Sequence, residues 1–163
     1  MSRLSNRDGI DHINIYSKGK TQLGKMLSNM YELSFTHPIY GKFPSVESFW
    51  YFNKFRRMNV GDQILFEFRK LSGFEAKKRA RQLDPEIDNG DKFNGQSRYF
   101  KQEIQKGLRL KVIQNDALKR SFVLSKLPFK HYYVFFEEND YEPEEYQWIP
   151  KYFESLRDEL QGK

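Results

Sequence analysis

Hydrophobic residues recur with helical spacing through much of the chain. The clearest case is the segment 97–114, where apolar residues occupy every fourth position from Phe100 to Val112. This spacing places them on one stripe of a helix that would pack against a core. Ser45 is suited to cap a helix start, because a hydroxyl can accept from the first free N–H groups. Together these signals predict helices at about 45–57, 61–71, 73–83, 97–114, 116–125 and 150–160.

Strand signals are fewer and shorter. Residues 12–17 alternate apolar and polar positions, and residues 132–136 are aromatic and prone to β-structure. A weak strand at 32–36 precedes turn signals at 36–44, which predicts a hairpin. Residues 84–95 and the acidic stretch 137–145 are expected to be loops. The order of these elements predicts an α+β fold: a single compact domain over 12–163, with a small β-sheet packed with several α-helices, after a flexible N-terminal tail at 1–11.

Composition narrows the class of protein. The chain has 163 residues and 17% aromatic residues, enough to bury a core, which excludes intrinsic disorder. No apolar run approaches membrane-spanning length, and the first residues lack the apolar core of a secretion signal, so we expect a cytoplasmic protein. The absence of cysteine excludes disulfides and thiolate chemistry. Three scattered histidines do not have metal-ligand spacing, so we expect no metal site.

Charge is unevenly distributed along the sequence. Residues 131–163 hold nine acidic and three basic residues, whereas residues 1–130 hold 25 basic and 13 acidic residues. A basic body favours a polyanionic ligand such as a nucleic acid or a nucleotide. A solvated surface of mixed charge would give the same count, so charge alone leaves both interpretations open.

One helix face combines the residue types that chemistry requires. Glu47, Trp50, Tyr51 and Lys54 occupy positions i, i+3, i+4 and i+7 of the helix predicted at 45–57 and therefore share a face. A carboxylate and an amine on that face could both touch one ligand. The alternative is structural: an acidic residue favours a helix start, a lysine is usually solvated, and rings at helical spacing usually pack in the core.

Three further segments hold candidate binding residues. Ser28 and Asn29 can hydrogen-bond to ribose hydroxyls or a base edge, or can form a turn. The basic loop 18–25 has two glycines and could hold a phosphate, but it departs from the phosphate-binding loop motif of nucleotide hydrolases, and no helix is expected after it. The aromatic stretch around His131 could cover a base, or form a buried strand. The candidate substrate-binding residues on this helix face and in or beside these segments are Tyr16, Lys18, Ser28, Asn29, Trp50, Tyr51 and His131.

Four blocks of the chain, in order and spacing, resemble the NADAR (NAD and ADP-ribose) superfamily, in particular its branch from phages and bacteria. They are LSNMY, YGKFPSVESFWYFNKF, GFEAKKRARQL and FKQEIQKGLRLKVIQN. The resemblance spans about residues 12–150. It departs from the family at residues 96–99, where many members carry a tryptophan. It departs again near the C-terminus, where Glu145 replaces the aspartate of an Asp-x-x-Trp-Gly motif while Trp148 keeps the spacing. The resemblance thereby adds Glu145 and Trp148 to the candidate substrate-binding residues.

The resemblance implies a mixed α+β fold and an N-glycosidase, with Glu47 and Lys54 as catalytic residues and Ser28 and Asn29 in the ligand pocket. The implied reaction is removal of ADP-ribose from guanine bases of DNA, which reverses a toxin or anti-phage modification. ADP-ribosylated DNA would be the substrate and ADP-ribose the product, with no cofactor, metal or membrane involved. The alternatives are an N-glycosidase acting on a ribosylated riboflavin-pathway intermediate or another free nucleotide, and a non-catalytic binder of ADP-ribose or nucleic acid.

Cleavage of a ribose–nitrogen bond passes through an oxocarbenium-like state, which a carboxylate stabilises. We expect Glu47 to provide this charge and to assist proton transfer. Lys54 has two roles that remain open. It could attack the anomeric carbon and form a Schiff base, since surrounding rings that exclude water favour a nucleophilic amine, or it could only bind phosphate.

Overall fold

The computed structural model describes residues 3–87, 97–135 and 139–163. Its internal contacts divide the chain into two compact units. The first unit combines residues 1–28 with 115–163, and the second contains residues 29–114. The sequence predicted one domain over 12–163, whereas these contacts separate a central segment from the two ends of the chain. The α+β class is confirmed: the described residues form seven α-helices and two short, two-stranded sheets.

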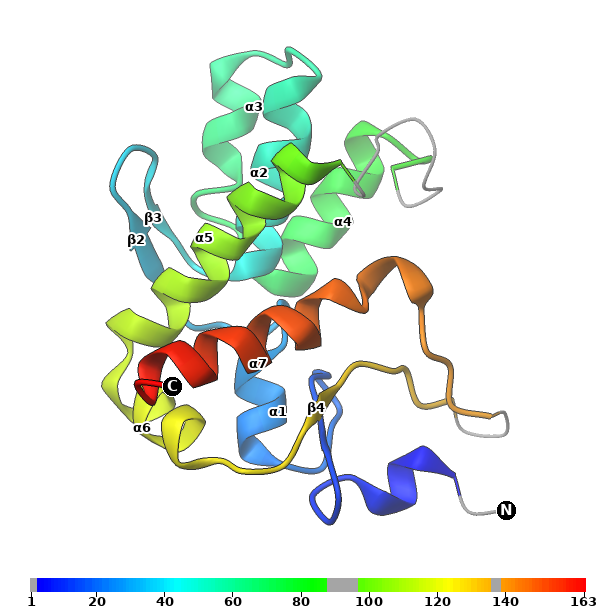
Figure 1. The fold of residues 1–163 in the computed structure, drawn as a ribbon. Helices are drawn as coiled ribbons and strands as arrows, with labels where there is room; N and C mark the ends of the chain where they lie inside the picture. The colour runs from blue at the N-terminus through cyan, green and yellow to red at the C-terminus, as the bar shows by residue number, and fades with distance from the viewer. Residues whose placement is uncertain (1–2, 88–96, 136–138) are drawn as a thin grey trace. The chain divides into compact units, whose positions relative to one another are not determined.

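The second unit is a group of helices with a hairpin beside them (Figure 1). Helix α2 is central, because α3, α4 and α5 all contact it, and α5 also contacts strand β2. All four helices lie within the segments that the sequence predicted, although α3 ends at Glu67, four residues before the predicted end. The predicted hairpin is the antiparallel pair β2–β3. The elements are β2 (Phe35–His37), β3 (Gly41–Phe43), α2 (Val46–Arg57), α3 (Asp62–Glu67), α4 (Gly73–Leu83) and α5 (Arg98–Gln114).

Helix α2 begins where the sequence indicated. The Ser45 side chain accepts from the backbone N–H of Ser48, and the Ser48 hydroxyl accepts from the backbone N–H of Ser45, which is a reciprocal capping box. These bonds satisfy donors that a helix start leaves open. The cap fixes the first residue of α2 and hence the direction in which its later side chains point.

Aromatic rings form the core between α2 and the hairpin. Phe49 of α2 is fully buried and lies with its ring centroid 5.5 Å from that of Phe35 and 5.0 Å from that of Phe43. Gly107 of α5 makes room for this ring, because a Cβ there would lie 2.6 Å from Phe49 Cδ2. The predicted apolar stripe of α5 is confirmed, since Phe100, Ile104, Leu108 and Val112 are all fully buried.

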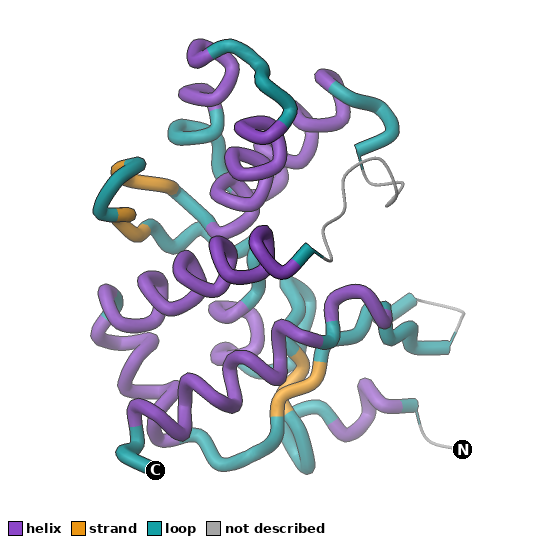
Figure 2. The backbone as a smooth tube through the Cα atoms, turned by 45° about the horizontal axis from the view of Figure 1, so that its top comes forward, coloured by secondary structure: helices purple, strands orange, loops and turns teal. Residues whose placement is uncertain are grey.

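The first unit joins both ends of the chain through a short parallel sheet (Figure 2). Ile13 pairs with Phe129, and Asn14 pairs with Lys130. Helix α7 packs on β4 and α6, while α1 packs on β1 and α6. The elements are a 3-10 helix η1 (Leu4–Arg7), β1 (Ile13–Asn14), α1 (Gln22–Leu27), α6 (Asp116–Leu124), β4 (Phe129–Lys130), a 3-10 helix η2 (Glu144–Tyr146) and α7 (Trp148–Leu160).

Three buried rings and one arginine hold α6, β4 and α7 together. The Phe122 and Phe129 rings stack with centroids 5.6 Å apart, and Phe153 packs edge-on against both. The Arg157 guanidinium lies 4.4 Å from the Phe129 ring centroid and donates to the carbonyl of Leu127 at 2.8 Å. The arginine therefore combines a cation–π contact with a backbone hydrogen bond, which suits its buried position.

The predicted flexible tail at 1–11 is corrected over its described part. Arg3 forms an ion pair with Asp140 at 2.7 Å, and residues 4–7 form η1. Asp8 is buried and accepts from the backbone N–H groups of Asn14 and Lys20. A buried carboxylate with two backbone partners anchors its segment to the unit, a tertiary effect that a polar composition does not reveal.

Two other predicted elements are displaced. The strand expected at 132–136 lies earlier, at Phe129–Lys130, because the strand Ile13–Asn14 pairs with Phe129 and Lys130. Within residues 132–135, Tyr133 forms a single β-bridge with Tyr141. The loop expected at 18–25 instead contains α1, whose start is capped by Thr21. The loops predicted at 84–95 and 137–145 fall partly outside the described residues.

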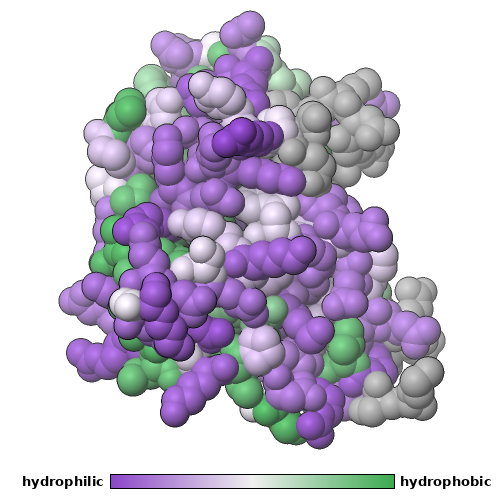
Figure 3. Space-filling view, viewed as in Figure 1, coloured by the Kyte–Doolittle hydropathy of each residue, from purple (hydrophilic) through white to green (hydrophobic). Residues whose placement is uncertain are grey.

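Hydrophilic side chains dominate the face of the molecule shown in Figure 3, with hydrophobic residues scattered among them. This agrees with a charged fraction of 31%. Across the described part of the chain, none of the helices combines the length and the apolar character that crossing a membrane requires.

Candidate functional site

The α2 face predicted from the sequence carries a lysine against two rings. The Lys54 Nζ lies 5.7 Å from the Trp50 ring centroid and 5.8 Å from the Tyr51 ring centroid. All three side chains are buried, with Lys54 only 6% exposed. The i, i+3, i+4 spacing therefore brings the amine and both rings together, as helix geometry predicts.

Neighbouring helices hold the two rings in place. The Phe100 ring meets the Trp50 ring edge-on with centroids 4.8 Å apart. The ring centroids of Phe68 and Tyr51 lie 6.2 Å apart. Lys54 Nζ also donates to the carbonyl of Ile87 at 3.4 Å. Ring faces and a carbonyl oxygen both carry partial negative charge, so these surroundings suit a cation. The amine is thus placed by packing rather than left to sample solvent.

Glu47 lies one turn before the rings, at the second position of α2. Its backbone N–H donates to the carbonyl of Asn29 at 2.9 Å, and its side chain is half-buried. A carboxylate at this position also interacts favourably with the positive end of the helix dipole. The hydrogen bond places the Asn29 backbone beside Glu47, so these two predicted residues lie together in the second unit.

The segment that follows Asn29 is held closely by α4. A Cβ on Gly73, the first residue of α4, would collide with the backbone carbonyl of Met30. Gly73 therefore allows the start of α4 to approach this segment, and the Asn29 carbonyl joins the same segment to α2. Two helix starts consequently fix the backbone beside Glu47.

The second unit therefore holds a half-buried carboxylate and a buried amine along one helix face. Seven residues of helix rise separate their Cα atoms by about 10 Å. That span suits a ligand with a sugar at one end and an anionic group at the other. A carboxylate stabilises positive charge, and a buried ammonium binds negative charge, so the pair can polarise a bond between them.

In the first unit, Tyr16 and His131 both contact the ring of Tyr133. The Tyr133 ring centroid lies 5.6 Å from the ring centroid of Tyr16 and 5.2 Å from that of His131. His131 Nδ1 donates to the carbonyl of Ile15 at 2.7 Å. Burial lowers the pKa of His131, while the Ile15 carbonyl and the charge of Glu145 oppose that shift. Sequence reasoning missed the linking role of Tyr133, although it noted the aromatic run.

The basic loop does not form the phosphate cradle considered from the sequence. The N–H of Gly19 donates to the Tyr16 carbonyl and that of Gly24 to the Thr21 hydroxyl, so both glycine donors are already used. The buried Asp8 carboxylate accepts from the Lys20 N–H, which places a negative charge where a phosphate would bind. Lys18 is exposed in this loop. Gly19 and Gly24 instead allow close approach to the Asn14 carbonyl.

The remaining predicted residues have clear structural positions. Ser28 is buried at the end of α1, where its N–H donates to the Lys25 carbonyl, so it belongs to the first unit and Asn29 to the second. Trp148 is the first residue of α7. Glu145 is exposed on η2.

A buried lysine on α5 was not anticipated. Lys111 is fully buried, and burial lowers its pKa to about 7. It follows Leu108 by three positions and Ile104 by seven, which places it on the same buried face. The spacing of Lys111 was visible in the sequence. A lysine is seldom fully buried, however, so the residue type argued against placing Lys111 on the buried face.

The described residues contain no group of three or more His, Asp or Glu side chains placed to hold a metal ion. No family model matches the chain, and neither the curated proteins nor the solved structures give a match. The function is therefore argued from the residues of the site and from the sequence resemblance.

Proposed function

We propose that this protein is an N-glycosidase that removes ADP-ribose from guanine bases of DNA. One observation carries the proposal: a half-buried carboxylate and a buried amine held against two rings share one face of α2. Their positions, Glu47 and Lys54, are those that match the acid and the lysine of the NADAR pattern. The Asn29 backbone beside Glu47 adds a third residue of that pattern.

The reaction breaks the bond between C1 of the ribose and a base nitrogen. Positive charge develops on the sugar as the base leaves, and the Glu47 carboxylate stabilises it. Glu47 then takes a proton from the attacking water, whose oxygen bonds to C1, and passes this proton to the base nitrogen, which restores the carboxylate. The products are free ADP-ribose and an unmodified guanine.

Lys54 acts in this proposal as a cation. Its contacts with two ring faces and a carbonyl suit an ammonium group, which would bind the diphosphate of ADP-ribose. The rival role is nucleophilic: attack on C1 expels the base, and ring opening leaves an imine that water hydrolyses. Borohydride during turnover distinguishes the roles, because it reduces an imine to a stable adduct on Lys54 and leaves an ammonium unchanged.

The direct test is to incubate the protein with guanine-ADP-ribosylated DNA and to measure released ADP-ribose by chromatography. We expect Glu47→Gln to lose activity by at least about 100-fold while its circular dichroism is unchanged, because the amide cannot supply the negative charge. Glu32→Gln is the matched control, since Glu32 is an exposed carboxylate in the same unit. Full activity of Glu47→Gln would refute the site.

The same assay separates the alternatives. A free-nucleotide glycosidase would cleave small ribosylated substrates and leave DNA intact. A non-catalytic binder would bind ADP-ribose in calorimetry and release nothing from either substrate. Each of these results contradicts the proposal.

A further inference from the structure

The net charge of the chain resides in the second unit. Residues 29–114 contain sixteen Lys and Arg against ten Asp and Glu, whereas the first unit contains twelve of each. Within the second unit the excess is concentrated at residues 69–83, which hold six basic residues and one acidic residue. This segment joins α3 to α4 and includes all of α4, so a polyanion would be attracted to this part of the unit.

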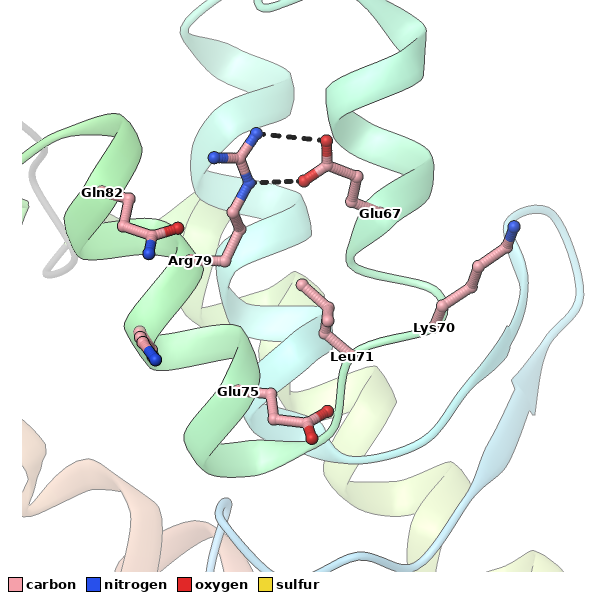
Figure 4. Close-up of a pocket in the computed structure, with 7 residues that line it drawn as sticks. Glu67, Lys70, Leu71, Glu75, Arg79 and Gln82 are labelled. Atoms are coloured by element: carbon pink, nitrogen blue, oxygen red, sulfur yellow. Dashed lines mark hydrogen bonds and ion pairs between the residues drawn. The ribbon is translucent and has the colours of Figure 1, made fainter.

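Residues of α3, of α4 and of the segment between them line an open groove of about 520 Å³ (Figure 4). An ion pair spans it: the Arg79 guanidinium donates to both Glu67 carboxylate oxygens, at 2.5 and 3.1 Å. This bidentate pair fastens α4 to α3 and neutralises both charges. Lys70 and Lys78 also line the groove, and both are exposed, against one further carboxylate, that of Glu75.

Two phenylalanine rings are exposed on the helices that form the groove. Phe66 of α3 is 49% exposed and Phe74 of α4 is 66% exposed. The Arg69 guanidinium lies 5.4 Å from the Phe66 ring centroid. Phe74 precedes Lys78 by four residues, so ring and cation are neighbours on α4, one turn apart. Neither ring is among the residues that line the groove, but exposed rings beside cations on the two helices that flank it form a pattern that binds unpaired bases.

We propose that the α3–α4 surface, defined by Phe66, Lys70, Phe74 and Lys78, binds single-stranded DNA. The lysines contact phosphates, and the phenylalanine rings stack on bases that no complementary strand covers. The choice of DNA among polyanions rests on the proposed function, while the choice of a single strand rests on the exposed rings. A base-paired duplex would offer the phosphates but would keep its base faces stacked.

The test measures binding of a fluorescent, unmodified 20-nucleotide strand by anisotropy over a range of salt concentrations. The Lys70→Glu/Lys78→Glu variant should bind at least ten-fold more weakly, with a log–log salt slope shallower by about 1.4, since each phosphate contact contributes about 0.7. The control is Lys119→Glu/Lys126→Glu, which changes the net charge equally at exposed lysines of the first unit. We expect the control to bind within about two-fold of the unaltered protein.

Phe74→Ala tests the stacking contribution separately. It should weaken binding of the strand by about five-fold or more and leave the salt slope unchanged, because no charge is removed. Equal effects of the two charge-reversal variants, or an unaltered affinity in Phe74→Ala, would overturn the assignment. Tighter binding of the matching duplex than of the single strand would also overturn it.

Failure of this surface and failure of the proposed function give different results. If the α3–α4 surface is wrong and the function is right, Lys70→Glu/Lys78→Glu releases ADP-ribose from modified DNA at the unaltered rate. If the function is wrong and the surface is right, the unaltered protein binds the strand, loses affinity in these variants and releases no ADP-ribose.

Discussion

Replacing Gly107 by alanine tests whether the packing of α5 against α2 is as close as the structure requires. A Cβ at this position would lie 2.6 Å from Phe49 Cδ2 and 2.8 Å from Phe49 Cε2, where ordinary contact begins near 3.4 Å. The Phe49 ring cannot retreat easily, because it is fully buried among the rings of Phe35, Phe43 and His37. The strain must therefore move α5 or α2.

Two opposing contributions determine the size of the effect. Overpacking a dense core costs about 1–3 kcal/mol, and a contact at 2.6 Å with a confined ring belongs in the upper part of that range, about 2–3 kcal/mol. Replacing glycine by alanine inside a helix contributes about 1 kcal/mol of stability. The expected net loss in the free energy of unfolding is about 1–2 kcal/mol. For a chain of this length, that lowers the melting temperature by about 2–8 °C.

Urea denaturation followed by circular dichroism measures this change. Gly61→Ala is the control for an added Cβ without a clash, since a Cβ there meets nothing within 4 Å. Because Gly61 is the N-cap of α3, where glycine is preferred to alanine, its stability should fall by less than about 1 kcal/mol. A Gly107→Ala protein as stable as the unaltered chain, or more stable, would refute the close packing of α2 and α5.

Two further predictions concern buried polar groups. Burial lowers the pKa of His37 below 6.5, and its Nδ1 accepts two backbone N–H bonds that protonation would break. The free energy of unfolding should therefore fall as pH decreases from about 6.5 towards the folded-state pKa. His37→Asn should reduce this loss, measured as the difference between urea midpoints at pH 7.5 and 5.5. Asp8→Ala should lower the free energy of unfolding by about 2–4 kcal/mol, because two backbone donors lose a charged acceptor; a loss below 1 kcal/mol in urea denaturation would contradict its anchoring role.

Local patterns predicted most of the helices and part of the candidate site. The Ser45 cap and the four-residue apolar spacing in α5 depend on neighbours in sequence, so α2 and α5 could be located directly. The same locality placed Lys54 against Trp50 and Tyr51, because residues one turn apart on a helix must be neighbours. The chemical role of these residues stays a prediction, since helical spacing is shared by structural and catalytic faces.

The predictions from the sequence were wrong where residues far apart in the chain decide which segments pair or are anchored. The strand expected at 132–136 lies at Phe129–Lys130 because its partner, Ile13–Asn14, is more than one hundred residues away. The first residues were expected to form a tail because no local pattern shows that Asp8 accepts bonds from Asn14 and Lys20.

The sequence by itself determined most of the segments that form helices, with α1 the exception, the residues that share one face of α2, and the excess of basic residues before the acidic C-terminal stretch. Only the tertiary structure decided the division into two units, the burial of Lys54 and Lys111, and the groove between α3 and α4. The physical reason is that helix spacing and capping depend on hydrogen bonds within a few residues, whereas burial depends on which distant side chains complete the packing around a group.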